Sequence, residues 1–277
     1  MLFAMDLDGT LISAQNGLDD ETLQVLKKVL AQGHEIAFVT GRNYEELIAE
    51  EKLWELDAYI IGMNGTVILA KDRTVLLEDR IADEVIAYLY QEYPDVPLEY
   101  LAFDQKMLTV DKTTFVDHFT SLFPAGFLDD PQMKKIMEHF VKTNTYDCDL
   151  EMLKRKAILK VEAMINNKRF GEMLVQDLQR KFADNLTCLY EGNSLLICPY
   201  ITNKGIALHW LCQYLALDKK EVFVFGDGEN DIPMLQAFDN SYVVMDAGIA
   251  IKAYAKEVID NSYDHGVIKK IMHIING

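Results

Sequence analysis

The strongest constraint on the fold is the position of the polar motifs, because each one lies where a short apolar run ends. A short continuous apolar run is typical of a strand that is buried on both faces of a parallel sheet. In open α/β sheets, the carboxyl ends of such strands line the crevice in which ligands bind. We therefore expect the motifs at one edge of one sheet. The runs are Leu2–Met5, Glu35–Val39, Tyr59–Gly62 and Val222–Phe225, and the polar residues that follow them are Asp6, Thr40, Asn64 and Asp227.

Helical stretches separate these runs. Leu23, Leu26 and Leu30 recur with the spacing of one helix face. Gly33 follows them at the place where a C′ glycine ends a helix. Further helices are expected near 203–214 and 266–275, on either side of a strand near 242–245. This alternation predicts an α/β fold with a doubly wound, mainly parallel, Rossmann-like sheet.

The middle of the chain has a different pattern. Two strand candidates, 98–103 and 107–110, follow one another with Asp104-Gln105 as a hairpin turn between them. Successive strands and helices of this kind favour an inserted α+β unit with a partly antiparallel sheet. We therefore expect a Rossmann-like core domain formed by residues 1–80 and 191–277, and an inserted α+β domain formed by residues 81–190. The alternative is one large continuous α/β domain.

Charge and composition exclude several classes of protein. The formal net charge of −17 repels phosphate backbones and anionic lipid, so neither nucleic acid nor a membrane is an expected partner. No run approaches the roughly 18 apolar residues of a membrane span. The N-terminus MLFAMDLDGT turns acidic at once and does not resemble a signal peptide. The four cysteines form no C-x-x-C pair, which favours reduced thiols. These features predict a cytoplasmic protein.

Asp6 and Asp8 form the first acidic pair. In an extended segment, residues two apart point to the same side, and Gly9 allows the chain to turn directly behind them. Two close carboxylates repel each other, and burial increases the cost. A proton on one of them or a hard divalent cation would offset this repulsion. The alternative is a pair of capping carboxylates at a strand-to-loop junction.

A second acidic cluster lies in the segment GDGENDIP at 226–233, where a strand ends and a helix is expected to begin. If the two strands are neighbours, Asp6, Asp8 and Asp227 converge. An oxygen-rich site with few nitrogen or sulfur ligands prefers Mg²⁺, which is often shared with a phosphate group. Calcium is the alternative metal, but the segment has neither the length nor the spacing of a calcium-binding EF-hand loop.

Three further residues suit a phosphate group. Thr40 and Gly41 offer a hydroxyl and a backbone N–H at a strand end, and Lys204 opens a helix whose N-terminus favours anions. Lys204 by itself would be interpreted as a solvated surface lysine. The chain contains no P-loop, no G-x-G-x-x-G after a strand and no G-x-S-x-G elbow, so a nucleotide site or a serine hydrolase is not indicated.

Four segments, in this order, resemble the motifs of the haloacid dehalogenase-like phosphatase superfamily. FAMDLDGTLI at 3–12 resembles the first motif, D-x-D-G-T, and VTGR at 39–42 resembles the second. Lys204 corresponds to the third and GDGENDIPML at 226–235 to the fourth. The insert of roughly a hundred residues before the third motif resembles the α+β (type C2) cap of the Cof-type subfamily. The segment YIIGMNGT at 59–66 also resembles a stretch of that subfamily.

The resemblance implies a Mg²⁺-dependent phosphatase that acts on small phosphorylated metabolites such as sugar phosphates. Asp6 would be the nucleophile that attacks phosphorus and forms an aspartyl-phosphate, and Asp8 the general acid and base. Mg²⁺ would be held by Asp6, by the backbone carbonyl of Asp8 and by Asp227. Asp231 would orient water ligands or Lys204. The residues implied to hold the phosphoryl oxygens are Thr40, Gly41, Lys204 and Asn230.

The resemblance also implies that the cap closes over the crevice and selects the leaving group. The hairpin tip near Asp104 to Lys106 would then be a contact, against the alternative of a solvated turn. Many relatives place Gly-Asn-Ala where this chain has Met245-Asp246-Ala247, so Asp246 is expected to alter the rim of the site. Two other functions stay open at this point: a phosphomutase, and a receiver-like phosphate-sensing module that also keeps paired acids around Mg²⁺.

Overall fold

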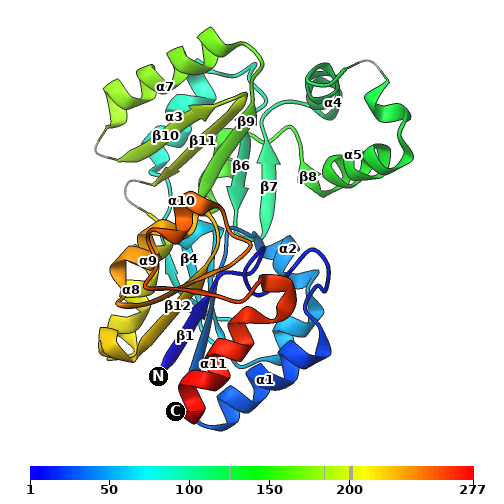
Figure 1. Ribbon diagram of the computed structural model, residues 1–277. Helices are drawn as coiled ribbons and strands as arrows, with labels where there is room; N and C mark the ends of the chain where they lie inside the picture. The colour runs from blue at the N-terminus through cyan, green and yellow to red at the C-terminus, as the bar shows by residue number, and fades with distance from the viewer. Residues whose placement is uncertain (125, 184, 200–201) are drawn as a thin grey trace. The chain divides into compact units, whose positions relative to one another are not determined.

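The structure is a computed structural model that describes residues 1–124, 126–183, 185–199 and 202–277, and of residues 128 and 136 the backbone alone. The chain forms two compact units (Figure 1). Met1–Glu78 and Thr202–Gly277 form the first, called here the core unit, and Asp79–Ile201 form the second, called the cap unit. Each unit has its own sheet and its own hydrophobic core.

The described residues of the core unit form a sheet in the order β14-β13-β12-β1-β2-β3-β4-β5. Strands β14 to β3 run parallel, whereas β4 pairs antiparallel with both β3 and the edge strand β5. The predicted doubly wound, mainly parallel α/β sheet is confirmed. The strands are β1 Leu2–Met5, β2 Glu35–Val39, β3 Tyr59–Gly62, β4 Val67–Leu69, β5 Val75–Glu78, β12 Val222–Gly226, β13 Asn240–Val244 and β14 Glu257–Ile259.

Helices cover both faces of this sheet (Figure 1). Helices α8 and α9 pack on one face around Leu208, Leu211 and Met234. Helices α1 and α11 lie side by side on the other. The central strands β1 and β12 carry apolar side chains along their whole length, and β1 is fully buried, so both faces of the sheet need a cover. The helices are α1 Asp20–Ala31, α2 Tyr44–Ile48, α8 Lys204–Tyr214, α9 Ile232–Ala237, α10 Ile249–Lys252 and α11 Gly266–Asn276.

The register of the central strands places the polar motifs beside one another. Met5, the last residue of β1, is aligned with Phe225 of β12 on one side and with Phe38 of β2 on the other. The backbone N–H of Asp6 donates to the carbonyl of Phe225 at 3.0 Å. Because β12, β1 and β2 are parallel neighbours, the segments that follow them emerge at the same edge of the sheet.

The cap unit contains a second sheet, in the order β10-β11-β9-β6-β7-β8. Its neighbouring strands are antiparallel except for the parallel pair β7 and β8. Helices α3 and α7 pack against it around Leu89, Leu174 and Leu178. A smaller cluster around Leu108 and Phe115 joins α4 and α5 to the end of β7. The elements are α3 Asp83–Glu92, β6 Glu99–Ala102, β7 Gln105–Leu108, α4 Lys112–Ser121, α5 Pro131–Thr143, β8 Asn144–Thr145, α6 Leu150–Lys154, β9 Lys160–Met164, α7 Lys168–Phe182, β10 Leu186–Glu191 and β11 Ser194–Pro199.

The joins between the units differ from the expected positions. The first lies between residues 78 and 79 and the second between 201 and 202, against the expected 80/81 and 190/191. The second difference arises because β11 pairs with β10 and β9 and therefore belongs to the cap sheet. An apolar run also precedes each polar motif of the core unit. The sequence pattern therefore does not distinguish β11 from a core strand, and the expected boundary at 190/191 is wrong. The hairpin turn also shifts by one residue, because Ala102 pairs with Gln105.

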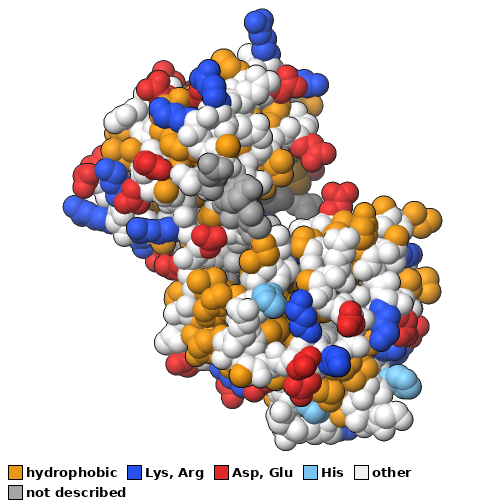
Figure 2. Space-filling view, turned by 90° about the vertical axis from the view of Figure 1, so that its left-hand side faces the viewer, with side chains coloured by type: hydrophobic (Ala, Val, Ile, Leu, Met, Phe, Trp, Pro, Cys, Tyr) orange, Lys and Arg blue, Asp and Glu red, His pale blue; other side chains and the backbone are white. Residues whose placement is uncertain are grey.

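No helix within the described part of the chain combines the length and the apolar composition needed to cross a membrane. On the face shown in Figure 2, acidic and basic side chains are interspersed with hydrophobic ones. The net charge of −17 is therefore not gathered into one patch on that face.

Candidate active site

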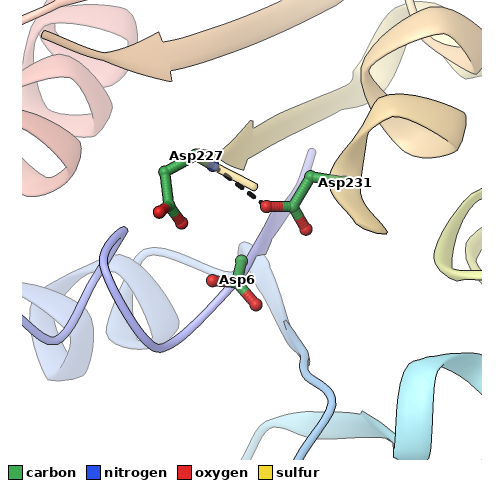
Figure 3. A group of neighbouring side chains, drawn as sticks. All are labelled: Asp6, Asp227 and Asp231. Carbon is green, nitrogen blue, oxygen red and sulfur yellow. Dashed lines mark hydrogen bonds between the residues drawn. The ribbon is translucent and has the colours of Figure 1, made fainter. Parts of the chain in front are cut away.

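Three carboxylates meet at the carboxyl end of the core sheet (Figure 3). Asp6 directly follows β1, Asp227 directly follows β12, and Asp231 directly precedes α9. One carboxylate oxygen of each lies within 4.8 Å of the other two. Asp6 and Asp231 are buried and Asp227 is half-buried. Segments from opposite ends of the chain thus supply one acidic cluster.

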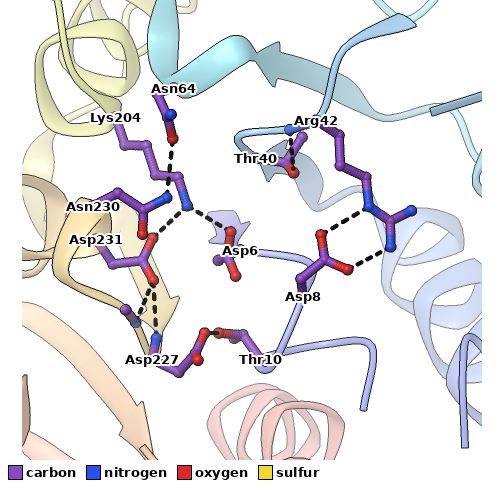
Figure 4. Close-up of polar contacts among 11 residues, drawn as sticks. Asp6, Asp8, Thr10, Thr40, Arg42, Asn64, Lys204, Asp227, Asn230 and Asp231 are labelled. Atoms are coloured by element: carbon purple, nitrogen blue, oxygen red, sulfur yellow. Dashed lines mark hydrogen bonds and ion pairs between the residues drawn. The ribbon is translucent and has the colours of Figure 1, made fainter. Parts of the chain in front are cut away.

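The ammonium group of Lys204 compensates part of this charge (Figure 4). Its Nζ donates to Oδ1 of Asp6 and to Oδ1 of Asp231, both at 2.6 Å. Lys204 begins α8, and Asn203 caps that helix by accepting two of its backbone N–H groups. The side chain of Lys204 is fully buried. The third motif is therefore an internal link between β1 and the loop after β12 and not a solvated lysine.

Burial and mutual repulsion shift the pKa values of these groups. The pKa of Asp6 is raised to about 7, first by burial and then by the charge of Asp231, against the opposing effect of Lys204. Burial also raises the pKa of Asp227. Burial acts to lower the pKa of Lys204, but the two carboxylates beside it outweigh this effect and the pKa is raised. Lys204 therefore keeps its positive charge at neutral pH.

The cluster fits a divalent cation. Three carboxylates face a single ammonium group, so the negative charge exceeds the positive charge in a largely buried place. Such an excess is costly unless a cation or a proton offsets it. The available ligands are carboxylate oxygens, which Mg²⁺ prefers. The donor set therefore agrees with the metal that the sequence predicts.

The hydrogen bonds of Asp231 separate its role from that of Asp227. Oδ1 of Asp231 accepts from Lys204, and Oδ2 accepts from the backbone N–H groups of Asp227 and Gly228 at 2.9 and 3.0 Å. Both oxygens are thus engaged in holding Lys204 and the loop. Asp6 and Asp227 are the carboxylates better placed to hold a cation.

Asp227 is fixed from the loop that carries Asp6. The hydroxyl of Thr10 donates to Oδ1 of Asp227 at 2.7 Å. Gly9 has a φ of +85° and approaches so closely that a Cβ there would lie 2.4 Å from Oδ2 of Asp227. The glycine of the first motif is therefore required both for the turn and for the contact between the two acidic loops.

The carboxylate of Asp8 is directed at Arg42 (Figure 4). Nε of Arg42 donates to Oδ2 at 2.8 Å, and Nη2 donates to Oδ1 at 2.6 Å. The hydrogen bond to Asp8 raises the pKa of Arg42. The side chain of Asp8 is 59% exposed, whereas that of Arg42 is 18% exposed. Asp8 thus stays outside the buried cluster and faces the solvent side of the site.

A pocket of about 650 Å³ opens in front of Asp6. Thr40 is buried and is not among the residues that line the pocket; its hydroxyl accepts from the backbone N–H of Arg42 at 3.1 Å. Lys204 and Asp231 are buried and are not among the lining residues, but they are bonded to Asp6 and to the loop after β12, which line the pocket. The pocket is lined by Asp6, Asp8, Gly41, Arg42, Glu46, Ala49, Asp227, Gly228 and Asn230.

Sequence reasoning assigned no role to three residues that the structure places at this site: Thr10, Arg42 and Asn64. Thr10 and Arg42 lie inside the first and second motifs. Asn64 follows β3, and its Oδ1 accepts from Nδ2 of Asn230 at 3.0 Å. All three are among the first polar residues that follow a buried strand, and this position is the sequence signal that could identify them.

Asp246 is expected to alter the rim of the site, but its carboxylate is bound to another part of the core unit. Its carboxylate accepts from the backbone N–H and the hydroxyl of Ser262, at 2.8 and 2.5 Å. It therefore ties the turn after β13 to the segment before α11. Asp246 is not among the residues that line the pocket described above.

The expected contact residues of the cap hairpin have partners inside the cap unit. Asp104 pairs with Lys156 at 2.9 Å. The ammonium group of Lys106 lies 5.1 Å from the centre of the Phe140 ring. Both interactions hold the hairpin to other parts of the cap unit.

An open parallel sheet with acidic loops at its strand ends defines a doubly wound α/β enzyme that binds its ligand at that edge. The family model described as haloacid dehalogenase-like hydrolase matches residues 3–271. The chain therefore belongs to the haloacid dehalogenase-like hydrolases.

Relatives and solved structures agree with this assignment. The HMP-PP phosphatase of Cronobacter sakazakii is 26% identical over 235 residues, which are 84% of this chain and 80% of that protein. A structure from Thermotoga maritima has a TM-score of 0.76 at 22% identity and covers 98% of this chain and 96% of its own. A haloacid dehalogenase-like hydrolase from B. subtilis has a TM-score of 0.72 at 21% identity, with 99% of both chains covered. The predicted family, and a hydrolase acting on phosphate esters, are confirmed.

Proposed function

We propose that this protein is a Mg²⁺-dependent phosphatase that hydrolyses small phosphorylated metabolites, such as sugar phosphates or similar monoesters, through an aspartyl-phosphate on Asp6. The observation that carries the proposal is the position of the Asp6 carboxylate. It stands at the end of β1, one oxygen is bonded to Lys204 at 2.6 Å, and it lines a pocket that Asp8 also lines. A nucleophile and a separate acid thus face one space.

Asp6 and Asp8 divide the chemistry between them. A carboxylate oxygen of Asp6 forms a bond to phosphorus while the bond from phosphorus to the ester oxygen breaks. Asp8 gives a proton to the departing alkoxide. In the second step it takes a proton from a water whose oxygen bonds to phosphorus while the bond between phosphorus and Asp6 breaks. Inorganic phosphate and the alcohol leave, and both carboxyl groups return to their starting states.

The remaining polar groups position the phosphoryl group. Thr40, the N–H of Gly41, Lys204 and Asn230 would hold its oxygens. Phosphoryl transfer asks mainly for such positioning and for charge neutralisation. Support comes from Gly41 and Asn230, which line the same pocket as Asp6 from two different loops.

Asp6, the backbone carbonyl of Asp8 and Asp227 would hold the metal ion. Bound Mg²⁺ would neutralise charge on the phosphoryl group and on the two carboxylates. Asp231 acts through its bonds to Lys204 and to the backbone of the loop after β12, which keep Asp227 in place. The excess of negative charge in this cluster supports a divalent cation.

A panel of phosphate esters assayed with Mg²⁺ tests this function, with released inorganic phosphate as the readout. HMP-PP belongs in the panel because it appears in the names of relatives. We expect turnover with release of inorganic phosphate, and its loss when EDTA removes the metal. Transfer of the phosphoryl group to a second position of the substrate without release would indicate a phosphomutase. A single phosphorylation of Asp6 without turnover would indicate a sensing module.

The cap hairpin is proposed as a contact for the leaving group, and Lys106 offers its test. We expect Lys106→Ala to change the relative kcat/KM values across the panel while hydrolysis of the best small ester persists. If the relative kcat/KM values stayed unchanged, Lys106 would not be a contact for the leaving group, and its contact with Phe140 would be its remaining interaction.

A further inference from the structure

The corner between β3 and β4, residues 63–65, has a left-handed backbone conformation that residues other than glycine rarely adopt. Met63, Asn64 and Gly65 follow one another with φ angles of +49°, +59° and +108°. Positive φ is accessible to glycine and tolerated by asparagine, but it is unfavourable for methionine. Such strain persists where the surroundings impose it, often at functional sites. Three contacts of this corner show what it holds.

The first contact is made by its backbone to the loop after β2. The N–H of Met63 donates to the carbonyl of Arg42 at 3.1 Å, and the N–H of Asn64 donates to the carbonyl of Thr40 at 2.9 Å. These two bonds flank Gly41 on both sides along the chain. The corner therefore orients the peptide segment that is proposed to offer its N–H to the phosphoryl group.

The second contact is made by the Asn64 side chain and reaches the loop after β12 (Figure 4). Oδ1 of Asn64 accepts from Nδ2 of Asn230 at 3.0 Å. The same oxygen lies directly against Gly41, because a Cβ built there would come within 3.2 Å of it. One amide group thus sets the spacing between Gly41 and Asn230.

The third contact joins the corner to α8. A Cβ built on Gly65 would lie 2.7 Å from the carbonyl oxygen of Asn203, the cap residue in front of Lys204. Any larger residue at this position would displace the start of that helix. The corner therefore touches each of the three segments to which the proposed function assigns a phosphate-binding residue: the loop after β2, the start of α8 and the loop after β12.

We infer that Asn64 is a positioning residue of the phosphate site, which acts through Asn230 and Gly41. This inference rests on the proposed function. Its side-chain oxygen accepts the hydrogen bond that orients the Asn230 amide. Its left-handed backbone lets its own N–H donate to the carbonyl of Thr40. With both loops fixed in advance, less ordering remains to be done when phosphate binds.

Asn64→Gly is the variant that tests this role, because glycine keeps the left-handed backbone and removes only the amide. We expect the inhibition constant of inorganic phosphate and the KM of p-nitrophenyl phosphate to rise about tenfold. The kcat and the thermal unfolding temperature should change little. Ala216→Gly is the matched control, because Ala216 is exposed and also has a positive φ, of 52°. It should leave all four values at those of the wild type.

A double variant separates positioning from a general loss of order. If Asn64 acts through Asn230, then Asn64→Gly combined with Asn230→Ala should weaken phosphate binding no further than Asn230→Ala alone. Independent effects would multiply to about a hundredfold, and that result would overturn the inference. So would a phosphate inhibition constant in Asn64→Gly equal to that of the wild type. In either case the wild type still hydrolyses the ester, so the proposed function stands. A wild type that neither hydrolyses esters nor binds phosphate would overturn both.

Discussion

Arg42 donates two hydrogen bonds, of 2.8 and 2.6 Å, to the carboxylate of Asp8, and these bonds join the loop after β2 to the loop after β1. The proposed acid of the reaction is therefore oriented by a residue of the second motif. A bidentate arginine–carboxylate pair restricts geometry more than a lysine contact does. This relationship gives the first prediction.

Arg42→Ala should lower kcat/KM about 10- to 100-fold for a sugar phosphate, because Asp8 loses the group that orients it as proton donor. The loss should be smaller for p-nitrophenyl phosphate, whose leaving group departs without a proton. Arg42→Lys should fall between the wild type and Arg42→Ala, since it offers only a point contact. Steady-state kinetics on both esters measures this. Equal losses on the two esters would show that Arg42 acts on substrate binding and not through Asp8.

Asp6→Asn should abolish turnover, by at least about 10³-fold, because an amide cannot serve as the nucleophile. The fold should persist, since the Asn64 corner and the Lys204 bond to Asp231 are untouched and the amide oxygen can still accept from Lys204. Phosphate release and circular dichroism measure the two parts. Retained turnover in a correctly folded variant would show that Asp6 is not the nucleophile.

Lys204→Met should destabilise the core unit by about 3–5 kcal/mol, because two buried carboxylates lose the cation between them. The exposed Lys220→Met is the control and should stay within about 0.5 kcal/mol of the wild type. Urea denaturation monitored by circular dichroism provides both values. A loss as small as that of Lys220→Met would mean that the charge of Lys204 is not needed to stabilise the cluster.

Mg²⁺ should raise the unfolding temperature of the metal-free protein, because an ion that binds only the folded state stabilises it. Asp227→Asn should remove most of this rise, since it deletes one of the two carboxylates available to the ion. The exposed Asp239→Asn should keep it. Thermal scans with and without Mg²⁺, after EDTA treatment, give the comparison. An equal rise in all three proteins would place the ion elsewhere.

Glu99 of β6 should make the cap unit less stable as pH rises. Burial raises its pKa from 4.5 to about 7, against the attraction of Lys106. Because the folded pKa lies above the unfolded one, the stabilisation is full below pH 4.5 and is lost as pH rises through about 7.

Glu99→Gln should therefore stabilise the protein at pH 8, by up to about 3 kcal/mol, and have little effect near pH 5. Glu191→Gln, at an exposed position of β10, is the control and should show no such trend. Denaturation at several pH values between 5 and 8 measures the difference. If the difference in the free energy of unfolding between the wild type and Glu99→Gln stayed constant across this pH range, the raised pKa of Glu99 would be contradicted.

The core fold and the acidic cluster could be predicted because their signals are local. A strand buried on both faces has to be apolar along its length, so Leu2–Met5 and Val222–Phe225 stand out in the sequence. The residue behind such a strand has to emerge at the ligand edge, which identifies Asp6 and Asp227. β11 shows the limit of this reasoning, because it has the same apolar pattern but pairs within the cap sheet.

The partners of the charged side chains could not be predicted in the same way. Asp246 binds Ser262, and Asn64 meets Asn230, through contacts between segments that are distant along the chain. Which loops become neighbours depends on strand order, and strand order depends on long-range pairing. A periodic pattern reports only that a face is buried and says nothing of what covers it.

The amino-acid sequence by itself determined that this chain alternates buried strands with helices and carries acids, a lysine and a hydroxyl behind those strands, because burial and helix periodicity act on neighbouring residues. Only the tertiary structure decided that Lys204 lies between Asp6 and Asp231, that Arg42 holds Asp8, and that Asn64 joins the loop after β2 to the loop after β12. Those contacts exist because β12, β1, β2 and β3 lie side by side, an order set by the packing of the whole unit and not by any segment of it.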